Sequence, residues 1–252
     1  MPKEKASIFA MLRGDEPSPL ARVWHDLSGA GEGEWGERCL LELLKNRAKN
    51  AAIFQNVYVP LGGGTTELDI VLVGSTGLYI FESKAYGGKI YGQPEQLNWA
   101  QYLGGSKNVF YNPIRQNENH RRNLARALQI SPEYICSIIV FENRADLSNI
   151  HPRHSESFVV CNRNKLLKHL KKLVNSRRPV LELTEMESIC RKLAKWSKVN
   201  RRTKKQHIKQ VQQQMHGALC PFCGRELLIK QGSYGPFIGC SGYPKCQYTR
   251  KI

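Results

Sequence analysis

The sequence has no long hydrophobic run. Its 252 residues have a mean hydropathy of −0.45, and no apolar stretch approaches the ~20 residues that a membrane-spanning helix needs. The apolar patch at residues 8–12 is also too short for the hydrophobic part of a secretory signal. We therefore expect a soluble, cytoplasmic protein with no membrane partner. A chain of this length is large enough to bury a substantial core.

Acidic residues are nearly missing from the C-terminal quarter. Residues 188–252 contain 14 Lys and Arg but a single acid, Glu226, whereas the first 187 residues hold 24 basic and 20 acidic side chains. Residues 188–225 contain no acid at all, so a helix there cannot form the i,i+4 ion pairs usual on solvated helices. The charge distribution predicts a polyanion-binding segment attached to a nearly balanced domain. The alternative is a basic, solvated helix that only aids solubility.

The sequence does not have the cysteine pattern of a disulfide framework. Only four of its eight cysteines are clustered, and a basic chain without a secretory signal belongs where thiols stay reduced. The other four stand singly among apolar neighbours: Cys39, Cys136, Cys161 and Cys190. We expect these four to be small buried hydrophobic residues without chemistry.

Hydrophobic periodicity predicts an α/β domain. Helical spacing indicates helices over 34–50, 113–128, 165–174 and 185–199, the second opened by Pro113. Strands are predicted over 53–59, 67–73, 78–84, 89–92, 135–141 and 158–161, with a loop containing Trp99 and Gly104-Gly105 after the fourth. A helix between the third and later strands allows a parallel, right-handed crossover. The fold class is therefore a mixed sheet flanked by helices.

The composition also divides the chain. We expect an N-terminal arm over residues 1–30, the α/β domain over 31–199, a basic linker over 200–217 and a small cysteine-rich module over 218–252.

Four cysteines in that last module have the spacing of zinc ligands. Cys220 and Cys223 form one pair, and Cys240 and Cys246 form another after 16 intervening residues. Tetrahedral zinc takes four ligands from two such turns. A module of ~35 residues is too small for a self-sufficient core, whereas zinc contributes ~10–16 kcal/mol to folding such modules. Four thiolates leave no open coordination position, so we predict a structural Zn2+.

The amino-acid sequence around these ligands resembles the C-terminal zinc ribbons of bacterial type IA topoisomerases. The resemblance extends to Gly235-Pro-Phe237-Ile-Gly-Cys240 and Tyr243-Pro-Lys-Cys246, and it implies binding of single-stranded DNA. Tyr234 and Phe237 offer rings on which bases can stack; the alternative is that such rings fill the small core of the ribbon. We expect the basic linker to contact phosphates through Arg201, Arg202, Lys204 and Lys205.

Charged residues interrupt two otherwise apolar strands. Asp69 lies within one strand, and Glu82 and Lys84 end the next. Because strand side chains alternate, Glu82 and Lys84 share a face. If the two strands form a hairpin, Asp69 comes near Glu82, and two buried carboxylates favour a divalent cation such as Mg2+ or Mn2+. Lys84 would then orient or deprotonate the attacking water, or stabilise charge on a phosphate. The alternative is an ordinary salt bridge at a strand end.

These residues resemble the nuclease-related domain, a branch of the PD-(D/E)xK nuclease superfamily. The motifs that match are Gly33-Glu34-Trp35-Gly36-Glu37, Glu67-Leu-Asp69, Phe81-Glu82-Ser83-Lys84 before Gly88, and Asn112-Pro-x2-Gln116-x3-His120. The resemblance implies a restriction-endonuclease-like core. It also implies roles for five residues: Asp69 and Glu82 as metal ligands, Lys84 as the catalytic lysine, Glu37 as an accessory acid and Gln116 as a positioning residue. We read His120 as a hydrogen-bonded surface histidine and not as a ligand.

The sequence therefore predicts a nuclease that hydrolyses DNA phosphodiester bonds with Mg2+ or Mn2+ and that carries a structural Zn2+. Its expected substrates are single-stranded DNA, or DNA ends and branches. RNA stays open, because phosphate and stacking contacts do not require a deoxyribose. The alternative class is a non-catalytic DNA-binding or scaffolding protein with a nuclease-like fold. Incubation with labelled DNA and either metal separates the two classes.

Overall fold

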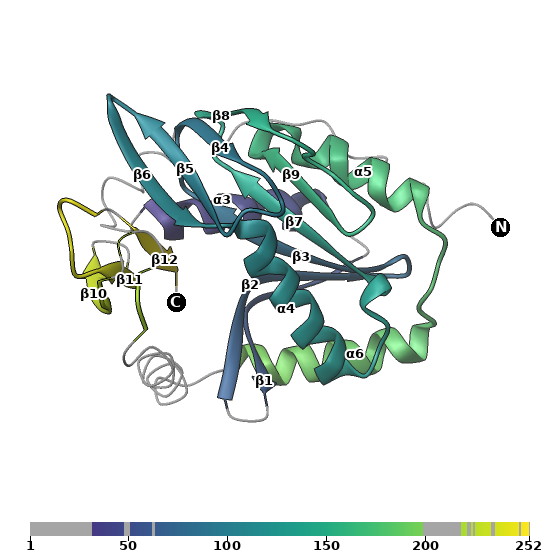
Figure 1. The fold of residues 1–252 in the computed structure, drawn as a ribbon. Helices are drawn as coiled ribbons and strands as arrows, with labels where there is room; N and C mark the ends of the chain where they lie inside the picture. The colour runs from purple at the N-terminus through teal and green to yellow at the C-terminus, as the bar shows by residue number, and fades with distance from the viewer. Residues whose placement is uncertain are drawn as a thin grey trace.

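Helices and two mixed β-sheets make up the body of the protein (Figure 1). The computed structural model describes residues 32–47, 51–61, 64–198, 218–220, 223, 225–232, 235–246 and 248–251. Within them the α-helices are α3 (Glu32–Arg47), α4 (Pro113–Leu128), α5 (Leu166–Ser176) and α6 (Leu183–Ser197). No helix in this part of the chain has the length and apolar character to cross a membrane. The expected mixed sheet flanked by helices is confirmed.

The first sheet has the strand order β1-β2-β3-β7-β9. Its strands are β1 (Ala52–Leu61), β2 (Gly64–Gly74), β3 (Gly77–Lys84), β7 (Ile135–Phe141) and β9 (Phe158–Asn162). The first three strands are antiparallel neighbours, whereas β3, β7 and β9 run parallel. The chain leaves β3, passes through α4 and returns as β7, which is the predicted parallel crossover.

Two apolar layers cover the faces of this sheet. On one face, Leu40 of α3 packs in a cluster with Ile70 and Phe81, and α5 joins the same cluster. On the other face, α4 and α6 pack against Val71 and Ile80. Figure 1 shows α4 crossing in front of the sheet and α3 behind it. Because strand side chains alternate, the residues that follow Ile80 at even positions face the side covered by α4.

The second sheet has the order β10-β11-β12-β6-β5-β4-β8. Its strands in chain order are β4 (Gly88–Gly92), β5 (Asn98–Leu103), β6 (Ser106–Tyr111), β8 (Ala145–Ile150), β10 (Leu227–Gly232), β11 (Gly235–Cys240) and β12 (Thr249–Lys251). The predicted loop after residue 92 is wrong, because β5 and β6 form a hairpin there. Gly104 and Gly105 make its turn with φ of 56° and 78°, a conformation that favours glycine.

The C-terminal module continues this second sheet. Thr249 of β12 pairs in parallel with Phe110 of β6, and Val109 of β6 packs in one cluster with Ile238 and Tyr248. Figure 1 shows the three short strands of the module beside β6. The module is therefore held against the body by backbone pairing as well as by apolar contacts. The predicted arm over 1–30 and the predicted linker over 200–217 lie outside the described residues.

Candidate functional site

The start of α4 is fixed by Asn112, which is fully buried. Its Oδ1 accepts the backbone N–H of Ile114 at 2.9 Å, so it caps the helix, and Pro113 occupies the first helical turn. Its Nδ2 donates to three backbone carbonyl oxygens, those of Gln93, Pro94 and Gln96. This anchoring sets the rotation of α4, so Gln116 and His120, one turn apart, face β3.

Three of the predicted site residues form a closed hydrogen-bonded group. Lys84 Nζ lies 2.8 Å from Glu82 Oε1 and donates to Gln116 Oε1 at 3.1 Å. Gln116 Nε2 donates to the same Glu82 oxygen at 3.1 Å. Glu82 and Lys84 are only 2% and 8% exposed, so their charges interact through a medium less polar than water. The structure thus brings together two strand residues and one helix residue on the face covered by α4.

Asp69 reaches the same end of β3 from the neighbouring strand. The β2–β3 register pairs Ile70 with Phe81, so the next position sets Asp69 across from Glu82. Here the Asp69 side chain bonds to the neighbouring strand: Asp69 Oδ2 accepts the backbone N–H of Ser83 of β3 at 3.1 Å. Asp69 is 4% exposed. The predicted hairpin is confirmed, and it holds the Asp69 carboxylate against the backbone next to Glu82.

His120 lies beside this group of side chains. Its Nε2 lies 4.0 Å from Glu82 Oε2, and its Nδ1 shares a hydrogen bond of 2.9 Å with Thr66 Oγ1. The side chain is hydrogen-bonded as expected, but it is only 13% exposed and so does not lie at the surface. Its spacing of four residues from Gln116 was the available signal, because that spacing places both side chains on one helix face.

Glu37 lies on the other side of the sheet. It is a half-buried residue of α3, the helix that packs on the face opposite α4. A Cβ atom on the preceding Gly36 would lie 3.1 Å from Ser83 Oγ and 3.0 Å from Glu142 Oε1. Glu37 therefore sits near the end of β3 but on a different helix from Gln116. Its role as an accessory acid stays a prediction.

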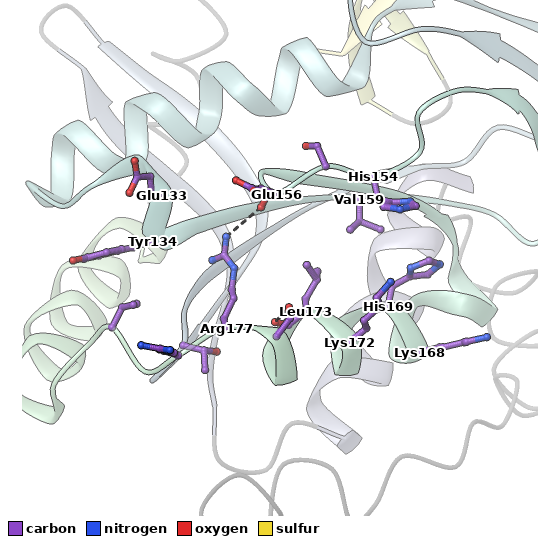
Figure 2. Close-up of a pocket in the computed structure, with 15 residues that line it drawn as sticks. Glu133, Tyr134, His154, Glu156, Val159, Lys168, His169, Lys172, Leu173 and Arg177 are labelled. Atoms are coloured by element: carbon purple, nitrogen blue, oxygen red, sulfur yellow. Dashed lines mark hydrogen bonds between the residues drawn. The ribbon is translucent and has the colours of Figure 1, made fainter.

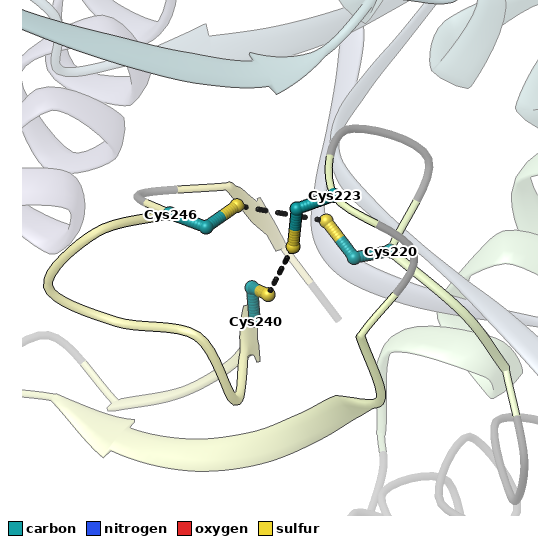
Figure 3. Close-up of side chains that lie close together, drawn as sticks. All are labelled: Cys220, Cys223, Cys240 and Cys246. Carbon is teal, nitrogen blue, oxygen red and sulfur yellow. Dashed lines mark hydrogen bonds between the residues drawn. The ribbon is translucent and has the colours of Figure 1, made fainter.

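The four clustered cysteines converge on one point (Figure 3). All four sulfur atoms lie within 4.8 Å of one another, with 3.7 Å between Cys220 and Cys246 and 3.3 Å between Cys223 and Cys240. A zinc tetrahedron with Zn–S bonds of ~2.3 Å has edges of about 3.8 Å. Among the described residues this is the one group of three or more such ligands gathered so closely. The residues therefore fit a structural Zn2+, as the spacing predicted.

The isolated cysteines have the properties of core residues. Cys39, Cys136 and Cys161 are buried, and Cys190 is half-buried. Burial raises the pKa of Cys136 to about 11 and that of Cys161 to about 12. Burial is also the largest cause of the raised pKa of Cys39 and Cys190. Thiols with such a pKa stay protonated and unreactive at neutral pH.

Tyr86 connects the end of β3 to the zinc module. It follows Lys84 by two residues, and its ring centroid lies 4.3 Å from that of Phe110 on β6. Phe110 is also the residue of β6 that pairs with Thr249 of β12. Burial is the main reason that the pKa of Tyr86 is raised. Tyr86 thus packs on β6 at the position where β6 pairs with β12.

One predicted nucleic-acid contact falls within the described residues. Phe237 is half-buried on β11 and lies opposite Lys230 of β10, whose ammonium group lies 5.3 Å from the ring centroid of Tyr243. Its stacking role stays a prediction. The other predicted contacts lie outside the described residues: Tyr234, Arg201, Arg202, Lys204 and Lys205.

Fold and site together define the class of this protein as an α/β domain with mixed sheets joined to a four-cysteine zinc ribbon. Family models give the particular domains. Residues 32–142 match the family described as nuclease-related domain, and residues 217–252 match the topoisomerase DNA binding C4 zinc finger. The chain therefore carries a nuclease-related domain followed by a topoisomerase-type zinc ribbon.

Individual relatives fall into two groups. An uncharacterised protein of Bacillus anthracis is 26% identical over 181 residues, which cover 71% of this chain and 82% of that protein. DNA topoisomerase 1 of Methanocaldococcus jannaschii is 51% identical over 45 residues, but these are 18% of this chain and 6% of the topoisomerase. An uncharacterised protein of Escherichia coli, YrdD, is 58% identical over 33 residues, 13% of this chain and 18% of that protein. No solved structure matches the chain.

Proposed function

We propose that the chain is a metal-dependent nuclease that hydrolyses DNA phosphodiester bonds. The observation that carries this proposal is the closed group of Glu82, Lys84 and Gln116, with Asp69 hydrogen-bonded to the adjacent backbone. Two carboxylates, completed by water and substrate phosphate oxygens, form the usual protein share of a Mg2+ site. Asp69 and Glu82 supply two such carboxylates, both buried, and burial of two carboxylates on neighbouring strands favours a divalent cation. Asp69 and Glu82 would hold Mg2+ or Mn2+.

Each side chain would have a separate part in hydrolysis. A bound divalent cation supplies Lewis-acid polarisation of the phosphate and lowers the pKa of an attacking water. Lys84 would stabilise the charge that develops on the phosphate oxygens, or orient the water. Gln116 would keep both charged groups in position, because it makes a hydrogen bond of 3.1 Å to the Lys84 ammonium group and another of 3.1 Å to Glu82 Oε1. The Ser83 N–H keeps Asp69 Oδ2 in place, so the carboxylate is preorganised.

The ribbon would hold the nucleic acid near this site. One of its relatives is named a DNA topoisomerase, and its family description includes DNA binding. The pairing of β12 with β6 holds the ribbon against the body, and the ring contact between Phe110 of β6 and Tyr86 joins β6 to the segment just after Lys84. Basic residues dominate the C-terminal quarter. We therefore propose that single-stranded DNA, or a DNA end or branch, contacts the ribbon while its backbone enters the site, with weak sequence preference.

Asp69→Asn tests the proposal with little change in structure. The amide oxygen can still accept the Ser83 N–H, but the charge that would bind the cation is lost. We expect cleavage in Mg2+ or Mn2+ to fall at least ~100-fold, while zinc content, DNA binding and the melting temperature stay close to those of the parent. The matched control is Asp146→Asn. Asp146 Oδ1 also accepts a backbone N–H, that of Ser148 at 2.9 Å, but this side chain is exposed on β8. Equal turnover by Asp69→Asn and the parent would refute the mechanism.

A second candidate function is DNA binding without cleavage. The observation that favours it is the saturation of Glu82 Oε1, which accepts from both Lys84 and Gln116. In that case the group is a structural ion pair. Binding of labelled DNA without products in either metal, combined with a Lys84→Met variant that changes only stability, would select this function. RNA substrates form a separate arm of the same assay, because the contacts argued here do not require a deoxyribose.

A further inference from the structure

A cavity of about 760 Å³ opens at the opposite edge of the first sheet from Glu82 and Lys84. Its lining includes Thr76, Tyr134 and Glu156, which lie just before β3, β7 and β9 respectively. These three strands are parallel, so their N-terminal ends share one edge, while Glu82 and Lys84 lie at the C-terminal end of β3. The cavity is therefore distinct from the proposed nuclease site.

Cationic side chains gather around this cavity. Four Lys and Arg residues line it, against two glutamates, Glu133 and Glu156. The basic residues are Lys168, Lys172, Arg177 and Arg178, and His154 and His169 also line it. Residues 163–181, which include α5, contain no acid. Burial is the main cause of the lowered pKa of His169, and neighbouring positive charges lower it further. The cavity is thus suited to an anion.

Arg177 has the most defined position among these cations. It is half-buried, and its Nη2 donates to the backbone carbonyl of Glu156 at 3.3 Å, as Figure 2 shows. A Cβ atom on Gly77, where φ is 120°, would clash with the Tyr134 carbonyl oxygen and lie 3.5 Å from Arg177 Nη1. Gly77 therefore permits the close packing of this wall. Because these contacts already hold the guanidinium group beside the cavity, Arg177 would lose little conformational entropy when it binds a ligand.

The lining also includes apolar side chains. Tyr134, Val159, Leu173 and Val180 contribute to it, and Figure 2 shows Leu173 between Arg177 and His169. Cavities of ~300–1,000 Å³ with an apolar lining and a few charged groups are typical of small organic ligands. A ligand that suits this cavity has a flat aromatic ring, which can lie against the Tyr134 ring, and a phosphate, which the cations can bind.

We propose that this cavity binds a nucleotide, with its phosphate on Arg177 and Lys172 and its base against Tyr134 and Leu173. The arginine fork suits phosphate oxygens through paired hydrogen bonds. The nucleotide comes either from a free nucleoside phosphate or from the phosphorylated end of a DNA strand. Neither source depends on cleavage at Asp69 and Glu82, so this site and the proposed nuclease activity stand or fall separately.

Isothermal titration of the zinc-loaded full chain without added Mg2+ tests the proposal. The probes are deoxyadenosine monophosphate, inorganic phosphate and deoxyadenosine. We expect the monophosphate to bind at one site per chain, phosphate to bind more weakly and the nucleoside to bind weakest. Lys172→Glu should weaken the monophosphate about tenfold or more, since it places a carboxylate beside the phosphate. Its matched control is Lys171→Glu on the same helix, an exposed residue outside the cavity lining, with an effect of about twofold or less.

Competition separates the two sources of the nucleotide. In the Asp69→Asn background, a 5′-phosphorylated oligonucleotide that displaces the monophosphate better than its unphosphorylated form indicates a strand end. Displacement by neither oligonucleotide indicates a free nucleotide. Arg177→Lys keeps the charge but removes the paired hydrogen bonds, so it should also weaken binding while the melting temperature is kept. No binding at millimolar monophosphate, equal binding of deoxyadenosine, or equal losses in Lys171→Glu and Lys172→Glu would each overturn the proposal.

Discussion

Gln116→Met tests how strongly the helix residue holds the charged pair at the end of β3. Gln116 makes two hydrogen bonds of 3.1 Å, one from the Lys84 ammonium group and one to the Glu82 carboxylate. Hydrogen bonds to charged groups contribute ~1.5–3 kcal/mol each. The Lys84–Glu82 contact at 2.8 Å remains in the variant, and Gln116 is partly exposed, so we take the lower end for the pair. The expected loss in the free energy of unfolding is about 3 kcal/mol, half of it from each hydrogen bond.

Gln101→Met is the matched control for this loss. Gln101 is 9% exposed and donates to the backbone carbonyl of Gly87 at 2.8 Å, with Asn108 at 3.4 Å. Both of its partners are neutral, so the same substitution should cost only about 1 kcal/mol. Urea unfolding of the zinc-loaded protein, followed by tryptophan fluorescence, measures both values.

A double-mutant cycle then isolates the contact itself. Lys84→Met alone should cost ~3–5 kcal/mol, because it leaves the buried Glu82 charge without its cation. Combined with Gln116→Met, the loss should be smaller than the sum of the single losses by about 1 kcal/mol. Additive losses, or a Gln116→Met loss no greater than that of Gln101→Met, would show that Gln116 does not hold the pair.

Three further predictions concern the rest of the molecule. Removing zinc with a chelator should make the ribbon sensitive to trypsin and weaken DNA binding, because zinc supplies ~10–16 kcal/mol of the folding energy of such modules. Limited proteolysis and a binding titration measure the two effects. An unchanged digestion pattern would contradict the zinc assignment. A thiol reagent at mildly alkaline pH should leave Cys136 and Cys161 unmodified until the protein is denatured, since burial raises their pKa to about 11 and about 12; mass spectrometry reads this directly. Tyr86→Leu should remove the ring contact with Phe110 and lower stability by about 1 kcal/mol. An unchanged unfolding midpoint in urea would mean that this contact does not help to hold β6 against the body.

Strong local signals in the sequence predicted their elements closely. The run of seven buried residues in β7, Ile135–Phe141, and the helix that starts at Pro113 have the predicted bounds. Continuous apolar strands and a capped, proline-opened helix are specified by their own residues. In contrast, β5 and β8 mix buried and exposed positions with polar residues such as Gln101 and Asn149. Pairing with neighbouring strands stabilises β5 and β8, and the local sequence of a strand does not show this contribution.

The candidate site divides in the same way. Alternation along β3 placed Glu82 and Lys84 on one face, and the hairpin placed Asp69 near them. The positions of Gln116 and His120 depend on how α4 packs over the sheet, which the sequence indicates only through the family resemblance. No local sequence pattern predicts the cavity that Arg177 lines. The lining of this cavity comes from separate segments between residues 76 and 180, which meet only when the parallel strands align.

The pairing of β12 with β6 also affects solubility. Without Thr249 beside Phe110, β6 would be an outer strand with unpaired backbone groups and with Val109 no longer covered by the ribbon. Such strands attract those of other molecules and promote aggregation. β12 therefore covers part of the β6 edge, and we expect a variant that lacks Thr249–Lys251 to form more oligomers through β6 than the parent.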